Sequence, residues 1–244
     1  MIGRCLLSSV VLPALLGASS ATAQPASAAP PSASTVPNTI EQRLLACASC
    51  HGAKGEGQRR NEYYPRLAGK PAGYLYNQLV NFRDKRREYA VMNYMLGYLS
   101  NNYLYEIADY YAKLDPPYPP PQTRAPAAEL ALGQRLVTEG DPARNLPACT
   151  TCHGQALTGT EPTIPALVGL YPPYITAQMG AWKNSKRHAM APDCMHEVAT
   201  RLTPTDIGAI TAWLVAQPVP ADPRPAGAET LKMPLECGGL TVKK

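Results

Sequence analysis

The chain of 244 residues carries 23 Lys and Arg against 18 Asp and Glu, for a formal net charge of +5. This excess of positive charge is modest, and the basic residues form no long patch within a nucleic-acid-binding motif, which excludes nucleic acid as a partner. Beyond the N-terminus no stretch reaches about 18 consecutive apolar residues, so the mature protein is expected to be soluble or peripheral to a membrane.

The N-terminus is typical of a secretory signal. Residues 1–23 contain one basic residue, Arg4, then an apolar stretch and small residues that end in Ala-Thr-Ala at Ala23. This order predicts cleavage near Ala23 and export of the mature protein to the periplasm. Residues 24–37, rich in Pro, Ala and Ser, are then expected to form a disordered leader.

The sequence Cys-x-x-Cys-His occurs twice, as CASCH at 47–51 and CTTCH at 149–153. In this motif the thiols add to the vinyl groups of a haem, and the imidazole binds the iron from the same side. A thioredoxin-like site would follow a strand and would not use the histidine, and a zinc site would need four ligands in a closed geometry. We therefore expect two covalently bound haem c groups. The attaching thiols are Cys47, Cys50, Cys149 and Cys152, and the iron-binding histidines are His51 and His153.

Two cysteines remain after this assignment. Of the seven, Cys5 lies in the signal and four belong to the motifs, which leaves Cys194 and Cys237. In an oxidising compartment leftover thiols usually pair, so a Cys194–Cys237 disulfide is predicted. Two free thiols are the alternative.

Two segments of the chain repeat each other. Residues 64–83 (YPRLAGKPAGYLYNQLVNFR) align without a gap with residues 164–183 (IPALVGLYPPYITAQMGAWK). Only two copies are present, so tandem domains are expected and not a solenoid. The identical pairs are Pro65 and Pro165, Leu67 and Leu167, Gly69 and Gly169, Tyr74 and Tyr174, and Gln78 and Gln178.

A proline-rich segment separates the two copies. Residues 115–126 hold six prolines in twelve positions, which predicts a stiff, extended linker. The domain boundaries predicted from it are 38–114 for the first domain, 127–217 for the second and 218–244 for a C-terminal tail.

Both domains are predicted to be helical. Apolar residues recur at helical spacing behind Pro71 in the first domain and behind Pro172 and Pro173 in the second. A last helix is expected after Ser100 in one and after Thr203 in the other, both good N-cap residues. No alternating strand pattern is present, so the predicted fold class is all-α.

The sixth ligand of each iron decides what such a haem does, since a second strong ligand favours electron transfer and an open position favours reaction with small molecules. In the first domain His51 is the only histidine, which excludes a bis-histidine site built from that domain alone. The candidates for a soft sixth ligand in this domain are Met92 and Met95.

These motifs resemble the di-haem cytochromes c of the cytochrome c4 type, which consist of two tandem class I cytochrome c domains. The resemblance covers roughly residues 40–217 and rests on the two haem motifs, the YPRLAG and IPALVG stretches, the Tyr-x-x-x-Gln helix starts and the LS and LT dipeptides. It implies a few helices wrapped around each covalent haem.

The resemblance also implies the axial methionines, which stand eight residues before the Ser or Thr that opens the last helix. Counting back from Ser100 gives Met92, and counting back from Thr203 gives Met195. The His-to-Met separations of 41 and 42 residues agree across the repeat. The rival ligands are Met95 in the first domain and Met190, His188 and His196 in the second.

Two prolines are assigned by the same resemblance. The carbonyls of Pro65 and Pro165 are expected to accept a hydrogen bond from the iron-binding imidazole. Their alternative role is to bend the loop. The chain departs from the family in its tail and in its tyrosines, since 12 of 14 lie between Tyr63 and Tyr118.

The resemblance implies an electron-transfer protein and not an enzyme. We expect a periplasmic carrier of single electrons between a respiratory donor, either a bc complex or a dehydrogenase, and a terminal acceptor such as a haem-copper oxidase. The first alternative is a fixed cytochrome subunit of a dehydrogenase complex. A di-haem peroxidase is the second, and it would need one haem able to lose its distal ligand.

Overall fold

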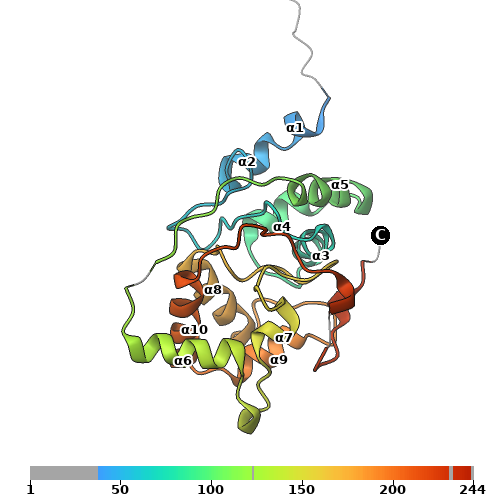
Figure 1. The fold of residues 1–244 in the computed structure, drawn as a ribbon. Coiled ribbons are helices and arrows are strands. Elements are labelled where there is room, and N and C mark those ends of the chain that lie inside the picture. Colours follow the sequence, from blue (N-terminus) through green and yellow to red (C-terminus); the bar gives the residue numbers. More distant parts are fainter. Residues whose placement is uncertain (1–37, 123, 231–232, 243–244) are drawn as a thin grey trace, which may run out of the picture. The chain divides into compact units, whose positions relative to one another are not determined.

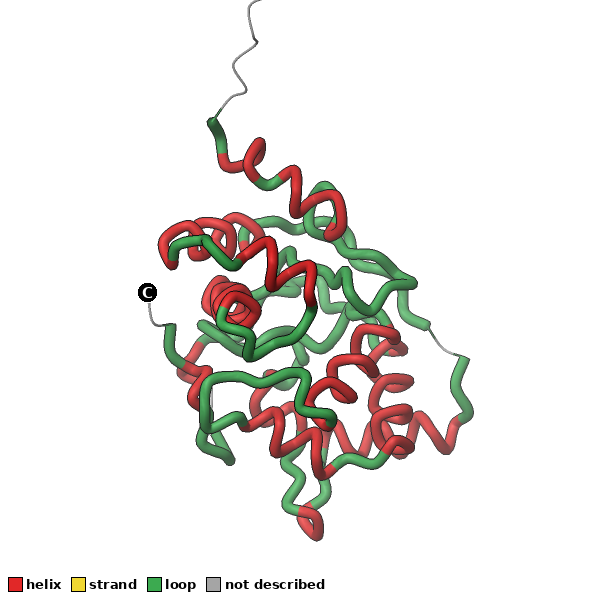
Figure 2. Tube along the Cα trace, turned by 180° about the vertical axis from the view of Figure 1, so that it is seen from behind, coloured by secondary structure: helices red, strands yellow, loops and turns green. Residues whose placement is uncertain are grey.

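The computed structural model of the protein describes residues 38–122, 124–230 and 233–242, so the predicted signal peptide, which includes Cys5, and the predicted leader at 24–37 lie outside the described residues. Within those ranges the regular structure is helical, with no β-strand (Figure 2). The all-α prediction is confirmed. The α-helices are α1 (Ile40–Arg43), α2 (Leu45–His51), α3 (Ala72–Arg83), α4 (Ala90–Leu96), α5 (Asn101–Ala112), α6 (Ala127–Thr138), α7 (Cys149–His153), α8 (Pro172–Lys183), α9 (Cys194–Arg201) and α10 (Pro204–Ala216).

The core of the first half, residues 38–114, forms where α3 packs against α5. Leu75 and Phe82 of α3 are buried, as are Leu104 and Ile107 of α5. Burial of each such side chain contributes about 1.5–3 kcal/mol relative to exposure. Helix α5 begins where the sequence predicts, because the Ser100 hydroxyl accepts a hydrogen bond from a backbone N–H of the first turn at 3.3 Å.

The second half, residues 127–217, is built around the close crossing of α6 and α10, which lie side by side (Figure 1). Thr203 and Asp206 form a reciprocal capping box at the start of α10, with Pro204 in the first turn. Gly133 of α6 faces the Ala209 carbonyl of α10 so closely that no side chain fits between them. Leu136 and Leu214, both almost completely buried, fill the core beside this crossing.

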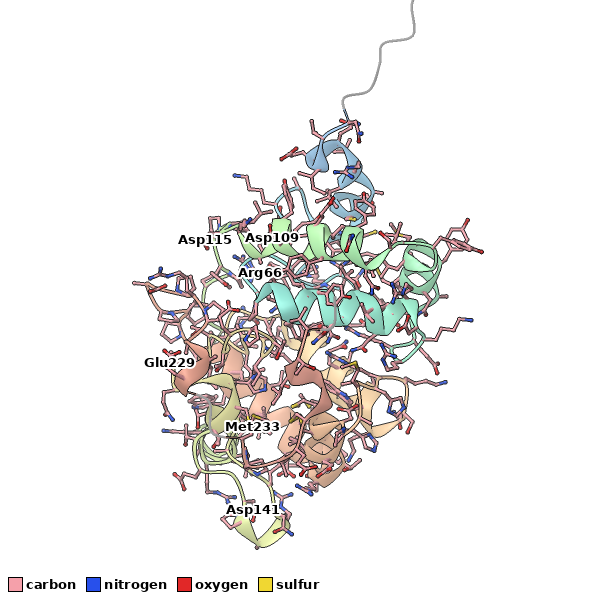
Figure 3. All side chains as sticks on the ribbon, turned by 90° about the vertical axis from the view of Figure 1, so that its right-hand side faces the viewer. Arg66, Asp109, Asp115, Asp141, Glu229 and Met233 are labelled. Carbon is pink, nitrogen blue, oxygen red and sulfur yellow. A yellow bond between two sulfur atoms is a disulfide. The ribbon has the colours of Figure 1, made fainter. Side chains whose placement is uncertain are left out.

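The proline-rich linker is attached to the first half by hydrogen bonds and by stacking. The buried Arg66 guanidinium donates to the carbonyls of Pro116 at 2.7 Å and Pro117 at 3.1 Å. It also lies over the Tyr118 ring at 3.6 Å, and Asp115 is 3.9 Å away (Figure 3). The described residues of the linker form no helix, as the proline content predicts. Both halves and the tail belong to one compact unit.

Six helices were not assigned from the sequence: α1, α2, α4, α6, α7 and α9. Helices α4 and α9 have seven and eight residues, too few for a helical repeat of apolar positions to stand out. They occupy equivalent places, since each precedes the last helix of its half. None of the helices among the described residues is long and apolar enough to cross a membrane.

Replacing Gly133 by Ala should lower the free energy of unfolding by about 1–3 kcal/mol, because the new methyl group would collide with the backbone of α10. The matched control is Gly208→Ala on α10, where the nearest atom to an added methyl group is a Glu129 carboxylate oxygen at 3.8 Å. This control should stabilise the protein by roughly 0.4–1 kcal/mol. Guanidinium titration measures both values, and equal stability of the two variants would contradict the close crossing.

Candidate haem-binding sites

A cavity of about 270 Å³ lies in the first half, and both parts of the predicted haem site contribute to its wall. Cys47, Cys50 and His51 reach it from α2, and Met92 reaches it from α4. The remaining wall is mostly apolar and includes residues of α3 and α5, such as Leu75. The fold therefore brings the Cys-x-x-Cys-His motif and the predicted axial methionine together although they are far apart in the sequence.

A second cavity, of about 190 Å³, repeats this arrangement in the second half. Cys149, Cys152 and His153 of α7 line it, together with Met195 of α9. Both cavities thus offer two motif thiols, one imidazole and the thioether of the predicted axial methionine within an apolar enclosure. These are the groups that attach and ligate a haem c.

One ring nitrogen of each motif histidine is hydrogen-bonded to a backbone carbonyl oxygen. His51 Nδ1 lies 2.9 Å from the Pro65 carbonyl oxygen, and His153 Nδ1 lies 2.7 Å from the Pro165 carbonyl oxygen. A carbonyl only accepts, so the Nδ1–H donates and Nε2 keeps the lone pair that a metal needs. Burial lowers the pKa of both imidazoles, which favours this neutral form. The structure contains the hydrogen bonds that the resemblance implies.

The motif thiols lie in surroundings that suppress ionisation. Burial raises the pKa of Cys149 to about 12 and also raises the pKa of Cys47. Neither motif is closed by a disulfide. A thioredoxin-like site requires a thiol whose pKa is lowered, so the surroundings of both motifs differ from those of a dithiol redox catalyst.

The rival axial ligands are placed differently in the two halves. In the first, Met95 also lines the cavity, but 38% of its surface is exposed, whereas Met92 packs against the core. In the second, Met190, His188 and His196 are absent from the cavity wall. The His196 ring lies 3.1 Å from the Trp182 carbonyl oxygen.

The two halves meet at a pair of buried arginines that sequence analysis did not identify. Arg87 donates to Gln178 at 2.7 Å and to its own half's Gln78 at 3.0 Å. Arg187 donates to the same two amide oxygens, at 2.7 Å and 3.0 Å. The sequence does contain an indication of this contact, because Arg87 and Arg187 keep the spacing of 100 residues that relates the aligned glutamines.

This contact carries more positive charge than its protein surroundings neutralise. Lys70 is buried beside the arginines and lines both cavities, and burial lowers its pKa to about 8. Burial alone would raise the pKa of Tyr174, but Arg87, Arg187 and Lys70 together lower it to about 7. No described carboxylate forms an ion pair with these three cations. A haem carries two propionates, so the buried positive charge that lines both cavities fits this cofactor.

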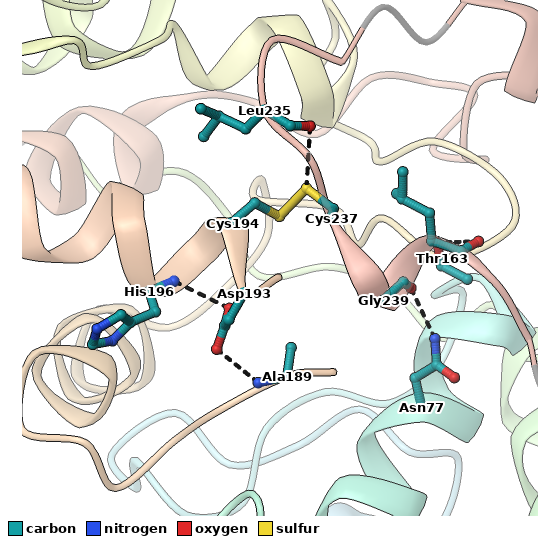
Figure 4. Close-up of a disulfide and its surroundings, with 10 residues drawn as sticks. Asn77, Thr163, Ala189, Asp193, Cys194, His196, Leu235, Cys237 and Gly239 are labelled. Atoms are coloured by element: carbon teal, nitrogen blue, oxygen red, sulfur yellow. Dashed lines mark hydrogen bonds between the residues drawn. A yellow bond between two sulfur atoms is a disulfide. The ribbon is translucent and has the colours of Figure 1, made fainter. Parts of the chain in front are cut away.

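The C-terminal tail closes part of the second site. The structure contains the Cys194–Cys237 disulfide, which joins the tail to the residue directly before Met195 (Figure 4). Met233 and Leu235 of the tail line the second cavity. Beyond the disulfide the tail reaches the first half, where Asn77 of α3 donates to the Gly239 carbonyl at 2.9 Å (Figure 4).

Comparison with known proteins identifies the family. The cytochrome c family matches residues 42–110. The thiosulfate dehydrogenase electron acceptor of Thiomonas intermedia is 44% identical over 176 residues, which cover 71% of this chain and 79% of the relative. The structure of reduced cytochrome c4 from Pseudomonas stutzeri superposes with a TM-score of 0.62 at 26% identity, over 72% of this chain and 95% of that one. The chain belongs to the cytochrome c4 family.

As a cytochrome c4-type protein, the chain is an electron-transfer protein with covalently bound haem c, not an enzyme, and has two tandem class I cytochrome c domains. A third similarity extends to a larger protein. The thiosulfate dehydrogenase TsdBA from Marichromatium purpuratum superposes with a TM-score of 0.62 at 34% identity over 70% of this chain. This chain spans only 36% of the length of that one.

Replacing Cys237 by Ser should lower the free energy of unfolding by up to about 4 kcal/mol, because the disulfide closes a loop with a sequence separation of 43. Guanidinium titration measures the loss. A reductant should destabilise the wild-type protein to the same extent and leave the variant unchanged. If the reductant destabilises both proteins equally, the tail disulfide is not the cause.

Proposed function

We propose that the protein is a periplasmic di-haem carrier that accepts single electrons from a thiosulfate dehydrogenase and passes them to a terminal acceptor. The observation that carries the proposal is the pair of cavities, each with a Cys-x-x-Cys-His motif and a methionine from a separate helix. The choice of donor is supported by the Thiomonas intermedia relative, which is named an electron acceptor of that enzyme.

In each site the protein's contribution is to hold ligands and exclude water. His51 and His153 present a neutral imidazole whose orientation is fixed by a proline carbonyl. Met92 and Met195 would supply a soft thioether ligand to the iron, which favours the reduced state. The bound haem would supply the one-electron iron couple. The apolar walls provide the low dielectric that tunes its potential.

The buried cations between the halves would bind the acidic edges of both cofactors. Arg87 lines the first cavity, Arg187 lines the second, and Lys70 lines both. A guanidinium is always protonated and matches a carboxylate with two parallel donors. With the propionates bound, the positive charge at the contact between the halves would be compensated, which favours loading of both sites.

A fixed subunit is the second candidate, because this fold matches part of the longer chain titled thiosulfate dehydrogenase. A bc complex as donor and a haem-copper oxidase as acceptor remain compatible with the sites.

The proposed donor is tested by mixing the oxidised holoprotein with thiosulfate and thiosulfate dehydrogenase and following haem reduction. Absence of reduction would contradict the proposal, and size-exclusion chromatography of native extract separates a free carrier from a subunit.

The number of haems can be tested by removing both thiols of one motif at a time. Cys47→Ala with Cys50→Ala, and Cys149→Ala with Cys152→Ala, should each lose about half of the haem signal on a denaturing gel, because each motif holds one haem. Combining all four substitutions should remove nearly all of it. Full signal after removal of either motif's thiols would overturn the attachment assignment.

The axial ligands can be tested separately from the attachment. Met92→Ala or Met195→Ala should leave one iron without its thioether, so that half of the haem becomes high-spin and its potential falls. Met95→Ala and Met190→Ala are the matched controls and should change neither property. Absorption spectra and a redox titration measure both. If a control variant shows the change instead, the ligand assignment in that half is wrong.

A further inference from the structure

Large exposed hydrophobic side chains gather in one half of the molecule. Among the described residues they are Leu45, Tyr63, Val91, Tyr94, Met95 and Tyr98, all in the first half. Tyr94 is 83% exposed and Tyr98 is 99% exposed. Exposed clusters of this kind mark interaction surfaces, and tyrosine is enriched in them. We call Tyr63, Val91, Tyr94, Met95 and Tyr98 the α4 patch, after the helix that carries or adjoins most of them.

The α4 patch lies at the mouth of the first cavity. Tyr63, Val91 and Met95 are exposed and also line that cavity, and the proposed iron ligand Met92 belongs to the same helix. Tyr63 stacks on Tyr89, the residue before α4, with ring centroids 4.7 Å apart. A protein seated on the patch would therefore contact the wall of the first cofactor site directly.

The equivalent surface of the second half is different. Counting back from Ser100 and Thr203, Tyr94 corresponds to Glu197 and Tyr98 to Arg201. Glu197 and Arg201 form an ion pair at 3.2 Å instead of an apolar surface.

The position equivalent to Val91 is Cys194, which is bonded to the tail. The tail residues Met233 and Leu235 line the second cavity. The repeat thus has one bare apolar face and one polar face occupied by the chain itself.

From this asymmetry we propose that the α4 patch is the surface on which the electron-donating dehydrogenase docks, so that electrons enter at the first haem. The inference rests on the proposed function. Its occupant is a redox protein with an apolar contact face and acidic side chains at the rim. Arg59 and Arg60, four and three positions before Tyr63, are exposed and form no ion pair with a described residue. Such charges steer an acidic partner, and electron-transfer contacts of this type are small and transient.

A dehydrogenase is favoured over other occupants by the TsdBA similarity, where a segment like this chain is part of a longer chain titled thiosulfate dehydrogenase. In that longer chain a segment of this fold is covalently part of the dehydrogenase. A separate carrier must replace the link by a surface, and the α4 patch is the exposed apolar surface that the described residues provide.

The test uses the holoprotein carrying Tyr94→Ser and Tyr98→Ser. Its second-order rate of reduction by thiosulfate-reduced dehydrogenase should fall about tenfold or more, because truncation of central tyrosines removes the main contacts. Glu197→Ser with Arg201→Ser, at the equivalent positions of α9, should keep the wild-type rate. Reduction by ascorbate and thermal unfolding should match the wild type in both variants, which shows that the haems and the fold are intact.

Each remaining outcome has one meaning. If the wild-type protein is not reduced by the dehydrogenase, the proposed function fails and the docking surface with it. If the wild type is reduced and the tyrosine variant is equally fast, or the α9 variant is equally slowed, the patch is not the docking surface. If analytical ultracentrifugation shows a wild-type dimer that the tyrosine variant abolishes without a change in reduction rate, the patch joins two copies of this chain.

Discussion

The reciprocal contact of Arg87 and Arg187 with Gln78 and Gln178 is the constraint on which the rest of the structure depends. Two guanidinium groups are buried between the halves, and each shares both amide oxygens. Like charges so close together are unfavourable unless anions compensate them. With haem propionates bound as proposed, folding of this contact and loading of the two cavities would be parts of one equilibrium.

The same logic explains why the repeat is only partly symmetric. Positions that line the cavities or fill the contact are kept in both halves, as the aligned tyrosine, glutamine and arginine pairs show. Positions that face outward have diverged. In one half they carry exposed tyrosines, and in the other an ion pair and the anchored tail. A duplicated domain can separate electron entry from electron exit in this way without any change in its core.

Much of this arrangement follows from the sequence, for physical reasons that differ between regions. The haem motifs are local, so Cys47 to His51 define their chemistry without knowledge of the fold. The caps at Ser100 and Thr203 are local as well. The contact of the halves was harder to predict, because a buried arginine looks like a surface arginine in a sequence and only the spacing of 100 residues marks Arg87 and Arg187 as a pair. The contact of the tail with the first half could not be predicted from the sequence, because Asn77 lies 162 residues before its partner Gly239.

The position of Cys194 has a consequence for the assembly of the protein. Cys237 lies 43 residues after it, and Cys152 lies 42 residues before it, as 194 − 152 gives. The entropy of closing either loop is almost the same, so an unfolded chain has no preference between the correct partner and a haem-attaching thiol. Cys152 is also made first during synthesis. If the chain is exported as proposed, it must therefore either fold the region around Met195 early or lose the competing thiol to a thioether bond before oxidation. Maturation of the second site therefore depends on which reaction of Cys152 comes first, thioether formation with haem or disulfide formation with Cys194.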